Sequence, residues 1–304
     1  MSKYYNLFNN NKDNNNNDSL KNEIEQRSLL TKFLMEDIGI GDITSNILID
    51  EEIDTKAQII CKNYGNIIVS GLEEAKSIFD ICNCSCTLLK KDGDIVKKDK
   101  TIVMEIQGPA RSILKAERTA LNLIMHMSGI STKTHQFIKK IGEYSKFVSI
   151  SSTRKTTPGL RRFDKKSVIL GGGISHRMRL DQLILIKDNH IAIIGSVSKA
   201  VSMAKSRFGS NRKIECEVSD YQGILDAIKA GADIVMLDNF TPQLVNESIE
   251  KIKEQGLRDK VVIEVSGGIT LDNINQYASS KPDIISIGSL THSFQAIDFS
   301  LEIV

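Results

Sequence analysis

Three features are scarce in this sequence, and each scarcity excludes a class of protein. Five cysteines among 304 residues do not make a disulfide framework, so a reducing cytoplasm is the expected location. The densest apolar runs, such as 183–186, fall far short of the roughly 18–20 residues that a membrane-spanning helix needs. An excess of one charge is also lacking, since 40 Lys and Arg against 38 Asp and Glu give a formal net charge of +2. That balance excludes a globally basic nucleic-acid coat protein and an acidic tail protein.

The composition that is present is that of an ordinary globular protein, 40% hydrophobic and 26% charged, in a chain long enough for two domains. The first 20 residues differ from the rest. They hold eight Asn and almost nothing apolar after Phe8, too little to offset the entropy of ordering a chain. We therefore predict that residues 1–20 form a disordered, Asn-rich tail.

Residues 21–127 mix helical and β-type patterns and predict an N-terminal α/β domain, on which the C-terminal segment 292–304 is expected to pack. Short β-type runs occupy residues 57–60, 67–69, 95–96 and 102–104, and helical patterns occupy 29–34, 72–79 and the stretch from 110 onward. Cys82, Cys84 and Cys86 alternate, so we expect them on one face of a strand, where they pack as small apolar side chains. A zinc site would use pairs of cysteines at a different spacing.

Six short apolar runs fill the remaining part, 128–291, and most are separated by amphipathic stretches of helical length. The runs lie at residues 147–150, 183–186, 214–218, 234–237, 261–265 and 284–287, and the helical stretches include 197–207, 221–229 and 242–255. Alternating strands and helices, with strands apolar on both faces, predict parallel β/α units. No glycine fingerprint of a dinucleotide-binding fold follows the first run, which favours a β/α barrel over an open sheet.

Polar residues and glycines gather where these runs end. They are residues 152–155, 187–190, 238–239, 266–268 and 288–289, with Glu215 and Glu217 inside the third run. In a β/α barrel the carboxyl ends of the strands form one rim, and active sites are built there. The sequence therefore predicts a site on this rim.

Residues 151–190 hold nine Lys and Arg against three Asp, a local excess of six positive charges. Bases concentrated near apolar strands repel one another, and a bound anion relieves that repulsion. Phe163 is the only aromatic residue of this stretch, so stacking on single-stranded nucleic acid is not expected. The glycines at 267–268 and 288 would let backbone N–H groups approach a phosphate. The predicted ligand is small and carries phosphate and carboxylate groups.

Two carboxylates on adjacent strands, Glu217 and Asp238, balance these bases. Beside a phosphate site they could hold a divalent cation, directly or through water, or the hydroxyls of a ribose. They could instead be structural partners of the bases. Glu215 lies two residues from Glu217 and so on the same strand face, which leaves the choice between them open.

Longer motifs carry a specific resemblance. In chain order they are residues 117–122 (ERTALN), 153–160 (TRKTTPGL), 171–173 (GGG) with His176 and Arg177, 186–190 (IKDNH), 237–239 (LDN) and 265–268 (VSGG). Over about residues 29–293 the chain resembles quinolinate phosphoribosyltransferase, a family also called carboxylating nicotinate-nucleotide pyrophosphorylase. The resemblance departs from the family pattern at Ser152, where Asp is expected.

The resemblance implies an N-terminal open-faced α/β sandwich domain and a C-terminal partial, six-stranded β/α barrel of the type II phosphoribosyltransferase kind. It implies a homodimer with composite active sites, and it leaves assembly beyond the dimer open. The implied reaction transfers a 5-phosphoribosyl group from phosphoribosyl pyrophosphate, with Mg²⁺, to quinolinate. Carbon dioxide and pyrophosphate are lost, and the product is nicotinate mononucleotide, on the de novo route to NAD.

The same resemblance assigns residues by motif. Those lining the quinolinate and pyrophosphate sites would be Thr153, Arg154, Lys155, His176, Arg177 and Lys187, with Arg118 entering from the partner subunit. Glu217 and Asp238 would face the ribose and the Mg²⁺. The 5-phosphate would be held by Ser266, Gly267, Gly268 and Gly288. Lys155, Lys187, Glu217 and Asp238 would carry the catalysis.

Two alternatives stay open at this point. One is a molybdenum-associated paralogue of the same fold, or a relative that takes another pyridine acid. The other is a non-catalytic barrel that binds a phosphometabolite without turning it over. Neither a nucleic acid nor a membrane is an expected partner.

Overall fold

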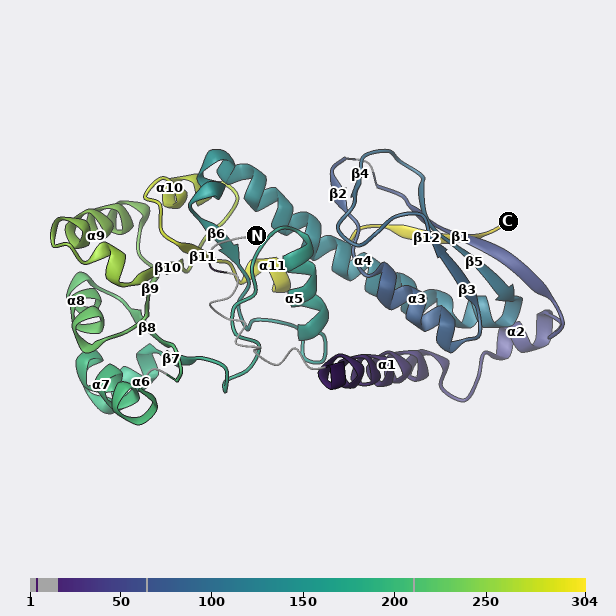
Figure 1. Cartoon of the computed structure of the whole chain (residues 1–304). Helices are drawn as coiled ribbons and strands as arrows, with labels where there is room; N and C mark the ends of the chain where they lie inside the picture. Colours follow the sequence, from purple (N-terminus) through teal and green to yellow (C-terminus); the bar gives the residue numbers. More distant parts are fainter. Residues whose placement is uncertain (1–3, 5–15, 64, 210) are drawn as a thin grey trace. The chain divides into compact units, whose positions relative to one another are not determined.

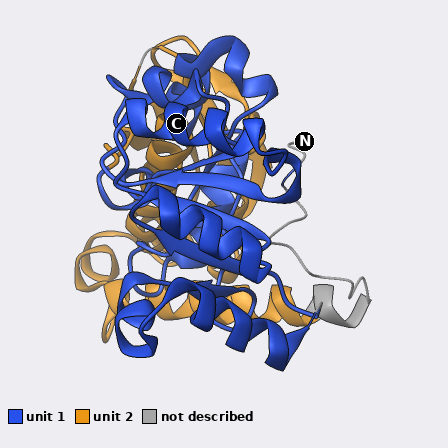
Figure 2. Cartoon of the chain, turned by 90° about the vertical axis from the view of Figure 1, so that its left-hand side faces the viewer, with its two compact units in different colours: residues 1–10, 134–293 blue, residues 11–133, 294–304 orange. Residues whose placement is uncertain are grey.

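The computed structural model describes Tyr4 and residues 16–63, 65–209 and 211–304, with the side chains of 16–20 left aside. The chain forms two compact units (Figure 2). Unit 1 comprises residues 1–10 and 134–293, and unit 2 comprises residues 11–133 and 294–304. Among the described residues, no helix is both long and apolar enough to cross a membrane.

Unit 2 is built on an antiparallel sheet with the strand order β12-β1-β5-β3. Its strands are β1 (Asp54–Cys61), β3 (Ser85–Leu88), β5 (Thr101–Pro109) and β12 (Phe299–Ile303), and β2 (Ile67–Ile68) pairs separately with β4 (Ile95–Val96). Its helices are α1 (Asn16–Ile38), α2 (Ile43–Leu48), α3 (Leu72–Ile81) and the first part of α4 (Ala110–Ile141). Strand β12 adds to the edge of β1, from Ala57 opposite Ile303 to Cys61 opposite Phe299, so the C-terminal strand completes this sheet.

Unit 1 contains a six-stranded parallel sheet with the order β6-β11-β10-β9-β8-β7 (Figure 1). Its strands are β6 (Ser149–Ser151), β7 (Ile184–Ile186), β8 (Ile214–Val218), β9 (Ile234–Asp238), β10 (Val262–Ser266) and β11 (Ile284–Ser286). All six predicted strands are present, each within two residues of its expected ends. The predicted partial β/α barrel is confirmed.

Helices follow the strands of unit 1. They are α5 (Arg161–Leu170), α6 (Asp188–Ile194), α7 (Val197–Phe208), α8 (Tyr221–Ala230), α9 (Pro242–Glu254), α10 (Ile274–Ala278) and α11 (Ser289–His292). Local sequence fixes where several of them begin. The Asp220 carboxylate accepts the N–H of Gly223 at the start of α8, and the Thr241 hydroxyl accepts the N–H of Leu244 ahead of Pro242 in α9. These are ordinary N-caps, and they end each strand-to-helix loop at a defined residue.

The strand register brings the polar strand ends to one edge. Ser266 lies opposite Asp238 on β9 and opposite Ser286 on β11, and Ser286 in turn lies opposite Ser151 on β6. The core beneath them is apolar, and Ile234, Ile263 and Ile284 are fully buried in it. The segments that follow these strands therefore begin at the same edge of the sheet.

Two sequence predictions need correction. The disordered tail predicted for residues 1–20 is wrong at Tyr4, which is buried, and at residues 16–20, which begin α1; the other residues of this segment lie outside the described part of the chain. Tyr4 is held by contacts with residues distant in sequence, which local composition does not reveal. The three alternating cysteines do not share a strand: Cys82 caps α3, and only Cys86 lies in β3. Asn83, at φ 61°, turns the chain between them.

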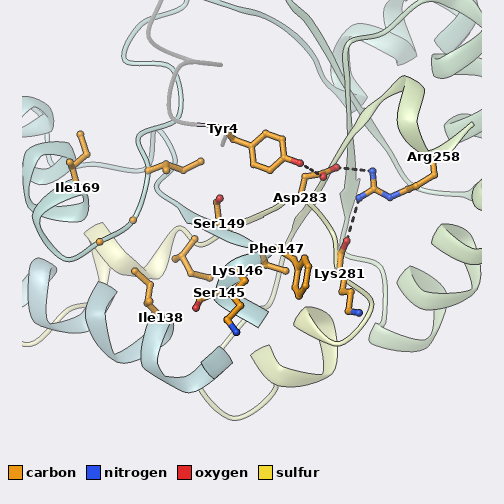
Figure 3. A pocket seen from close by; sticks show the side chains of 15 residues that line it. Tyr4, Ile138, Ser145, Lys146, Phe147, Ser149, Ile169, Arg258, Lys281 and Asp283 are labelled. Atoms are coloured by element: carbon orange, nitrogen blue, oxygen red, sulfur yellow. Dashed lines mark hydrogen bonds and ion pairs between the residues drawn. The ribbon is translucent and has the colours of Figure 1, made fainter. Parts of the chain in front are cut away.

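A cavity of about 850 Å³ lies at the amino ends of the strands of unit 1, near the starts of β6 and β11 (Figure 3). The Tyr4 hydroxyl donates a hydrogen bond to the Asp283 carboxylate there. Arg258 forms an ion pair with the same carboxylate at 2.9 Å, and the N–H of Ile263 donates to it at 2.7 Å. Asp283 thus ties Tyr4 to the amino-terminal end of the strands.

Candidate functional site

A second pocket of unit 1, about 680 Å³ in volume, lies at the carboxyl ends of the strands. Twelve predicted site residues line it: Thr153, Arg154, Lys155, His176, Arg177, Lys187, Glu217, Asp238, Ser266, Gly267, Gly268 and Gly288. Arg118 belongs to unit 2 and lies on α4, where its side chain is 58% exposed and 3.7 Å from Glu117. The pocket is therefore assembled from all six strand ends of one unit, and the role of Arg118 stays a prediction.

Two guanidinium groups on the pocket wall have buried donors without acceptors. Arg177 is 5% exposed and donates through Nη1 to the carbonyl of Leu183 at 2.8 Å. Its Nε, and the Nε of Arg154, have no hydrogen-bond partner among the described residues. Burial, and then repulsion from Arg154, lower the pKa of Arg177. A buried donor left without a partner costs about 1–3 kcal/mol, so an anionic ligand would stabilise this wall.

His176 turns both ring nitrogens toward the protein. Its Nδ1 accepts the N–H of Arg177 at 2.8 Å, so the ring proton must be on Nε2. Nε2 lies 2.9 Å from Oε2 of Glu215 and 3.6 Å from Oε2 of Glu264. Burial lowers the pKa of His176 to about 4, which keeps the ring neutral at physiological pH. His176 lines the pocket, but its ring nitrogens bond to the backbone of Arg177 and to Glu215.

The choice between Glu215 and Glu217 is settled by their depth in the barrel. Glu217 lines the pocket, and its Oε2 lies 2.9 Å from Nζ of Lys187. Glu215 is one strand repeat deeper, fully buried beneath His176, where burial raises its pKa to about 8. Glu217 is therefore the carboxylate that a ligand in the pocket can reach.

Asp238 is the second carboxylate of the pocket. Its Oδ2 accepts a hydrogen bond from Nδ2 of Asn239 at 2.6 Å. Burial raises the pKa of Asp238, repulsion from Glu217 raises it further, and Lys187 and Lys155 act against both effects. The site therefore places two carboxylates and two ammonium groups close enough to influence one another.

Two glycine-containing loops, which follow β10 and β11, also line the pocket. Gly267 has φ +98°, and a Cβ there would lie 2.2 Å from Oδ1 of Asn239, so only glycine fits. A Cβ at Gly288 would lie 3.0 Å from Cδ of Lys155 and 3.2 Å from Nε2 of His292. Both loops expose backbone where a side chain would otherwise fill the pocket.

Several residues near the pocket escaped the sequence analysis. Glu264, Ser286 and His292 also line it, and Lys165 lies buried beside it. Glu264 had a detectable signal, because it precedes Ser266 by two residues and so shares its strand face. Lys165 had none, since nothing in an amphipathic helix pattern shows that a lysine is buried. Ser152, where the resemblance led us to expect Asp, is fully buried, and its hydroxyl has no partner among the described residues.

Fold and pocket together define a β/α-barrel protein whose strand-end pocket is lined by arginine, lysine and carboxylate side chains. The family model for the quinolinate phosphoribosyl transferase N-terminal domain matches residues 42–128, and that for the C-terminal domain matches residues 130–302. The chain belongs to the quinolinate phosphoribosyltransferase family.

Individual relatives agree with this assignment. A probable carboxylating nicotinate-nucleotide pyrophosphorylase of Methanocaldococcus jannaschii is 44% identical over 91% of this chain and 96% of its own. The carboxylating nicotinate-nucleotide pyrophosphorylase of Rattus norvegicus is 35% identical over 91% of this chain and 90% of its own. The solved nicotinate-nucleotide pyrophosphorylase of Francisella tularensis superposes with a TM-score of 0.84 at 38% identity, covering 92% of this chain and 96% of that chain.

Proposed function

We propose that this chain transfers the 5-phosphoribosyl group of phosphoribosyl pyrophosphate to quinolinate, releasing carbon dioxide and pyrophosphate and forming nicotinate mononucleotide for NAD biosynthesis. Its relatives carry the name of this activity. One observation in the pocket supports it most directly, namely the buried Arg177 guanidinium, whose Nε lacks an acceptor among the described residues. We further propose the cytoplasm as its location, because all five cysteines are free thiols.

Quinolinate carries two adjacent carboxylates, and the basic wall suits them. Arg154 and Arg177 offer planar forks of N–H donors, which match carboxylates better than ammonium groups do. Thr153 adds a hydroxyl at the same strand end. We assign quinolinate to this wall.

Phosphoribosyl pyrophosphate would occupy the rest of the pocket. The backbone of Ser266, Gly267, Gly268 and Gly288 would hold the 5-phosphate. Lys155 and Lys187 would bind the pyrophosphate, whose negative charge grows as its bond to the sugar breaks. Glu217 and Asp238 would lie against the ribose, where a positive charge develops.

The family reaction implies Mg²⁺ bound with phosphoribosyl pyrophosphate, and the residues present fit that ion. Glu217 and Asp238 supply the hard oxygen donors that Mg²⁺ prefers. The pKa of Asp238 is raised by burial and by repulsion from Glu217, an unfavourable concentration of negative charge that a cation would reduce. When bound, Mg²⁺ would neutralise part of the charge on the leaving pyrophosphate.

The reaction needs no nucleophilic side chain from the protein. The ring nitrogen of quinolinate attacks C1 of the ribose as the C–O bond to pyrophosphate breaks, which makes a pyridinium. The C–C bond to the 2-carboxylate then breaks, carbon dioxide leaves, and its electron pair stays on the ring carbon beside the positive nitrogen. A proton adds to that carbon and gives the product. The residues of the pocket bind, orient and balance charge throughout.

We propose that two copies of the chain form a homodimer in which Arg118 reaches the partner's pocket. The exposed side chain of Arg118 on α4 supports this, because a base with so few contacts is available for a partner. Larger assemblies are compatible with the same contact.

Release of labelled carbon dioxide from carboxyl-labelled quinolinate tests the proposed function. We expect release that requires quinolinate, phosphoribosyl pyrophosphate and Mg²⁺ together. Absence of release by folded protein would reject the proposal. Turnover of another pyridine acid would then favour a paralogue, and binding of phosphoribosyl pyrophosphate without turnover would favour a non-catalytic barrel.

A further inference from the structure

Three buried ionisable side chains lie beneath the segment that carries His176 and Arg177. Lys165, on α5, is 1% exposed, and Glu215 on β8 and Glu264 on β10 are 0% exposed. The proposed reaction gives none of the three a role. Burying an ionisable group is unfavourable unless it forms hydrogen bonds or ion pairs. The partners of these three side chains therefore indicate what they stabilise.

Lys165 bonds to the backbone of this segment. Its Nζ donates to the carbonyl of His176 at 2.5 Å and to the carbonyl of Arg177 at 3.0 Å, and it also reaches Oγ of Ser175 at 3.5 Å. One ammonium group thus joins three consecutive residues. Burial lowers the pKa of Lys165 to about 7, which shows that its charged form is unfavourable at this position. The hydrogen bonds to residues 175–177 are the contacts that offset this cost.

The two glutamates hold the other side of the segment through the His176 ring. The Nε2–H of His176 donates to Glu215 at 2.9 Å, and Glu264 lies 3.6 Å from the same nitrogen. On the opposite side of the ring, Nδ1 accepts the backbone N–H of Arg177. The imidazole is therefore a fixed link between buried carboxylates and the backbone of Arg177.

These contacts fix the position of Arg177. Its N–H is fixed by His176, its carbonyl by Lys165, and its Nη1 donates to the carbonyl of Leu183 at 2.8 Å. The Nε that remains has no partner among the described residues, and the side chain lines the pocket. A guanidinium held in this way can bind a carboxylate without first losing conformational freedom.

We propose that Lys165 and Glu215, with Glu264 beside them, are positioning residues that hold Arg177 for recognition of an aromatic acid with two adjacent carboxylates. This inference rests on the proposed function, since it takes the acid to bind at Arg177. Lys165 and Glu215 act through the His176–Arg177 segment and do not line the pocket.

Phthalate is a suitable probe, because it has two adjacent carboxylates and no ring nitrogen, so it binds without reacting. Its affinity is measured by calorimetry for wild type, Lys165→Met, Glu215→Met and Glu215→Gln. Lys253→Met is the matched control, because Lys253 lies on another helix of unit 1 with its side chain 67% exposed. Cooperative thermal unfolding establishes which variants fold.

We expect both Met variants to bind phthalate roughly tenfold or more weakly, since displacement of a binding group by a fraction of an ångström has effects of this size. Glu215→Gln should bind like wild type, because the amide oxygen still accepts the Nε2–H of His176. The affinity for phosphoribosyl pyrophosphate should stay within about twofold in all variants, because the hydrogen bonds of Lys165 and Glu215 go to residues 175–177 and not to the groups assigned to that ligand. A merely structural role would weaken both ligands alike.

Wild-type phthalate affinity in any folded Met variant would overturn the proposal, and the two variants test it independently if one does not fold. Wild type that binds phthalate but releases no carbon dioxide from quinolinate would reject the proposed reaction and leave the positioning intact. Wild type that does not bind phthalate would overturn the positioning proposal, and the carbon dioxide assay would still decide the proposed reaction.

Discussion

Nζ of Lys187 lies 2.9 Å from Oε2 of Glu217, which joins the end of β7 to β8 by an ion pair inside the pocket. Lys187 is the base that we assign to the leaving pyrophosphate, and Glu217 is a carboxylate that we assign to the ribose. In the proposed reaction, charge of opposite sign develops at these two places in the same step. The ion pair therefore holds the two groups within hydrogen-bond distance of each other before the ligands arrive.

Loss of Lys187 provides a test of shared active sites. Lys187→Ala and Arg118→Ala should each abolish turnover, the first by removing a base of the pocket and the second by removing the proposed contribution of the partner. After the inactive proteins are mixed and their subunits exchanged, one site in each mixed dimer has both residues. An equal mixture should recover about a quarter of wild-type activity if dimers are symmetric and exchange at random. No recovery after proven exchange would exclude composite sites formed with Arg118.

Gly267→Ala should weaken binding of phosphoribosyl pyrophosphate. The new Cβ would lie 2.2 Å from Oδ1 of Asn239 at a backbone φ of +98°, so the loop must move away from the phosphate. We expect KM for phosphoribosyl pyrophosphate to rise roughly tenfold or more, in line with a strain of about 1–3 kcal/mol. KM for quinolinate should change little.

Gly256→Ala is the control that distinguishes an effect of backbone strain from an effect on the phosphate site. Gly256 also has a positive φ, +65°, but a Cβ there would meet no atom within 4 Å. It follows α9, outside the pocket, so its substitution should lower stability and leave both KM values unchanged. Equal KM values in the two variants would contradict a phosphate site at Gly267.

The sequence was sufficient to predict the strands of unit 1 and the residues at their ends, because apolar runs and strand-end glycines are local patterns. Glu217 and Glu215 could not be separated, since a period of two places both on one face and says nothing of depth. The burial of Tyr4 and of Lys165 was also invisible. Each depends on a partner far away in the sequence, Asp283 for Tyr4 and the backbone of 176–177 for Lys165.

Glu264 should make stability depend on pH in a defined direction. Burial, and then repulsion from Glu215, raise its pKa from 4.5 to about 7, so the folded state binds this proton more tightly than the unfolded state. The corresponding stability is fully present below pH 4.5 and is lost as the pH rises through about 7. Glu264→Gln removes this titration while keeping the shape of the side chain.

The measurement is the melting temperature of Glu264→Gln minus that of wild type, at pH 5 and at pH 8. We expect this difference to increase with pH, because only wild type has to ionise a buried carboxyl group at residue 264. Glu250→Gln, at a side chain 55% exposed on α9, should show the same difference at both values. A Glu264→Gln difference that is constant or decreases with pH would contradict the assignment.

Tyr4→Phe should destabilise unit 1 without changing catalysis. The substitution keeps the buried ring and removes the hydroxyl that donates to Asp283, at the amino ends of the strands (Figure 3). Loss of one such hydrogen bond costs about 1 kcal/mol, which corresponds to a melting temperature roughly 2–4 °C lower. The kcat should stay at the wild-type value, because the proposed site is at the opposite ends of the strands.

Tyr221→Phe is the control, since the Tyr221 hydroxyl has an exposed partner, Gln255, and its loss should leave the melting temperature nearly unchanged. Equal melting temperatures of Tyr4→Phe and wild type would show that the hydroxyl contributes nothing to stability.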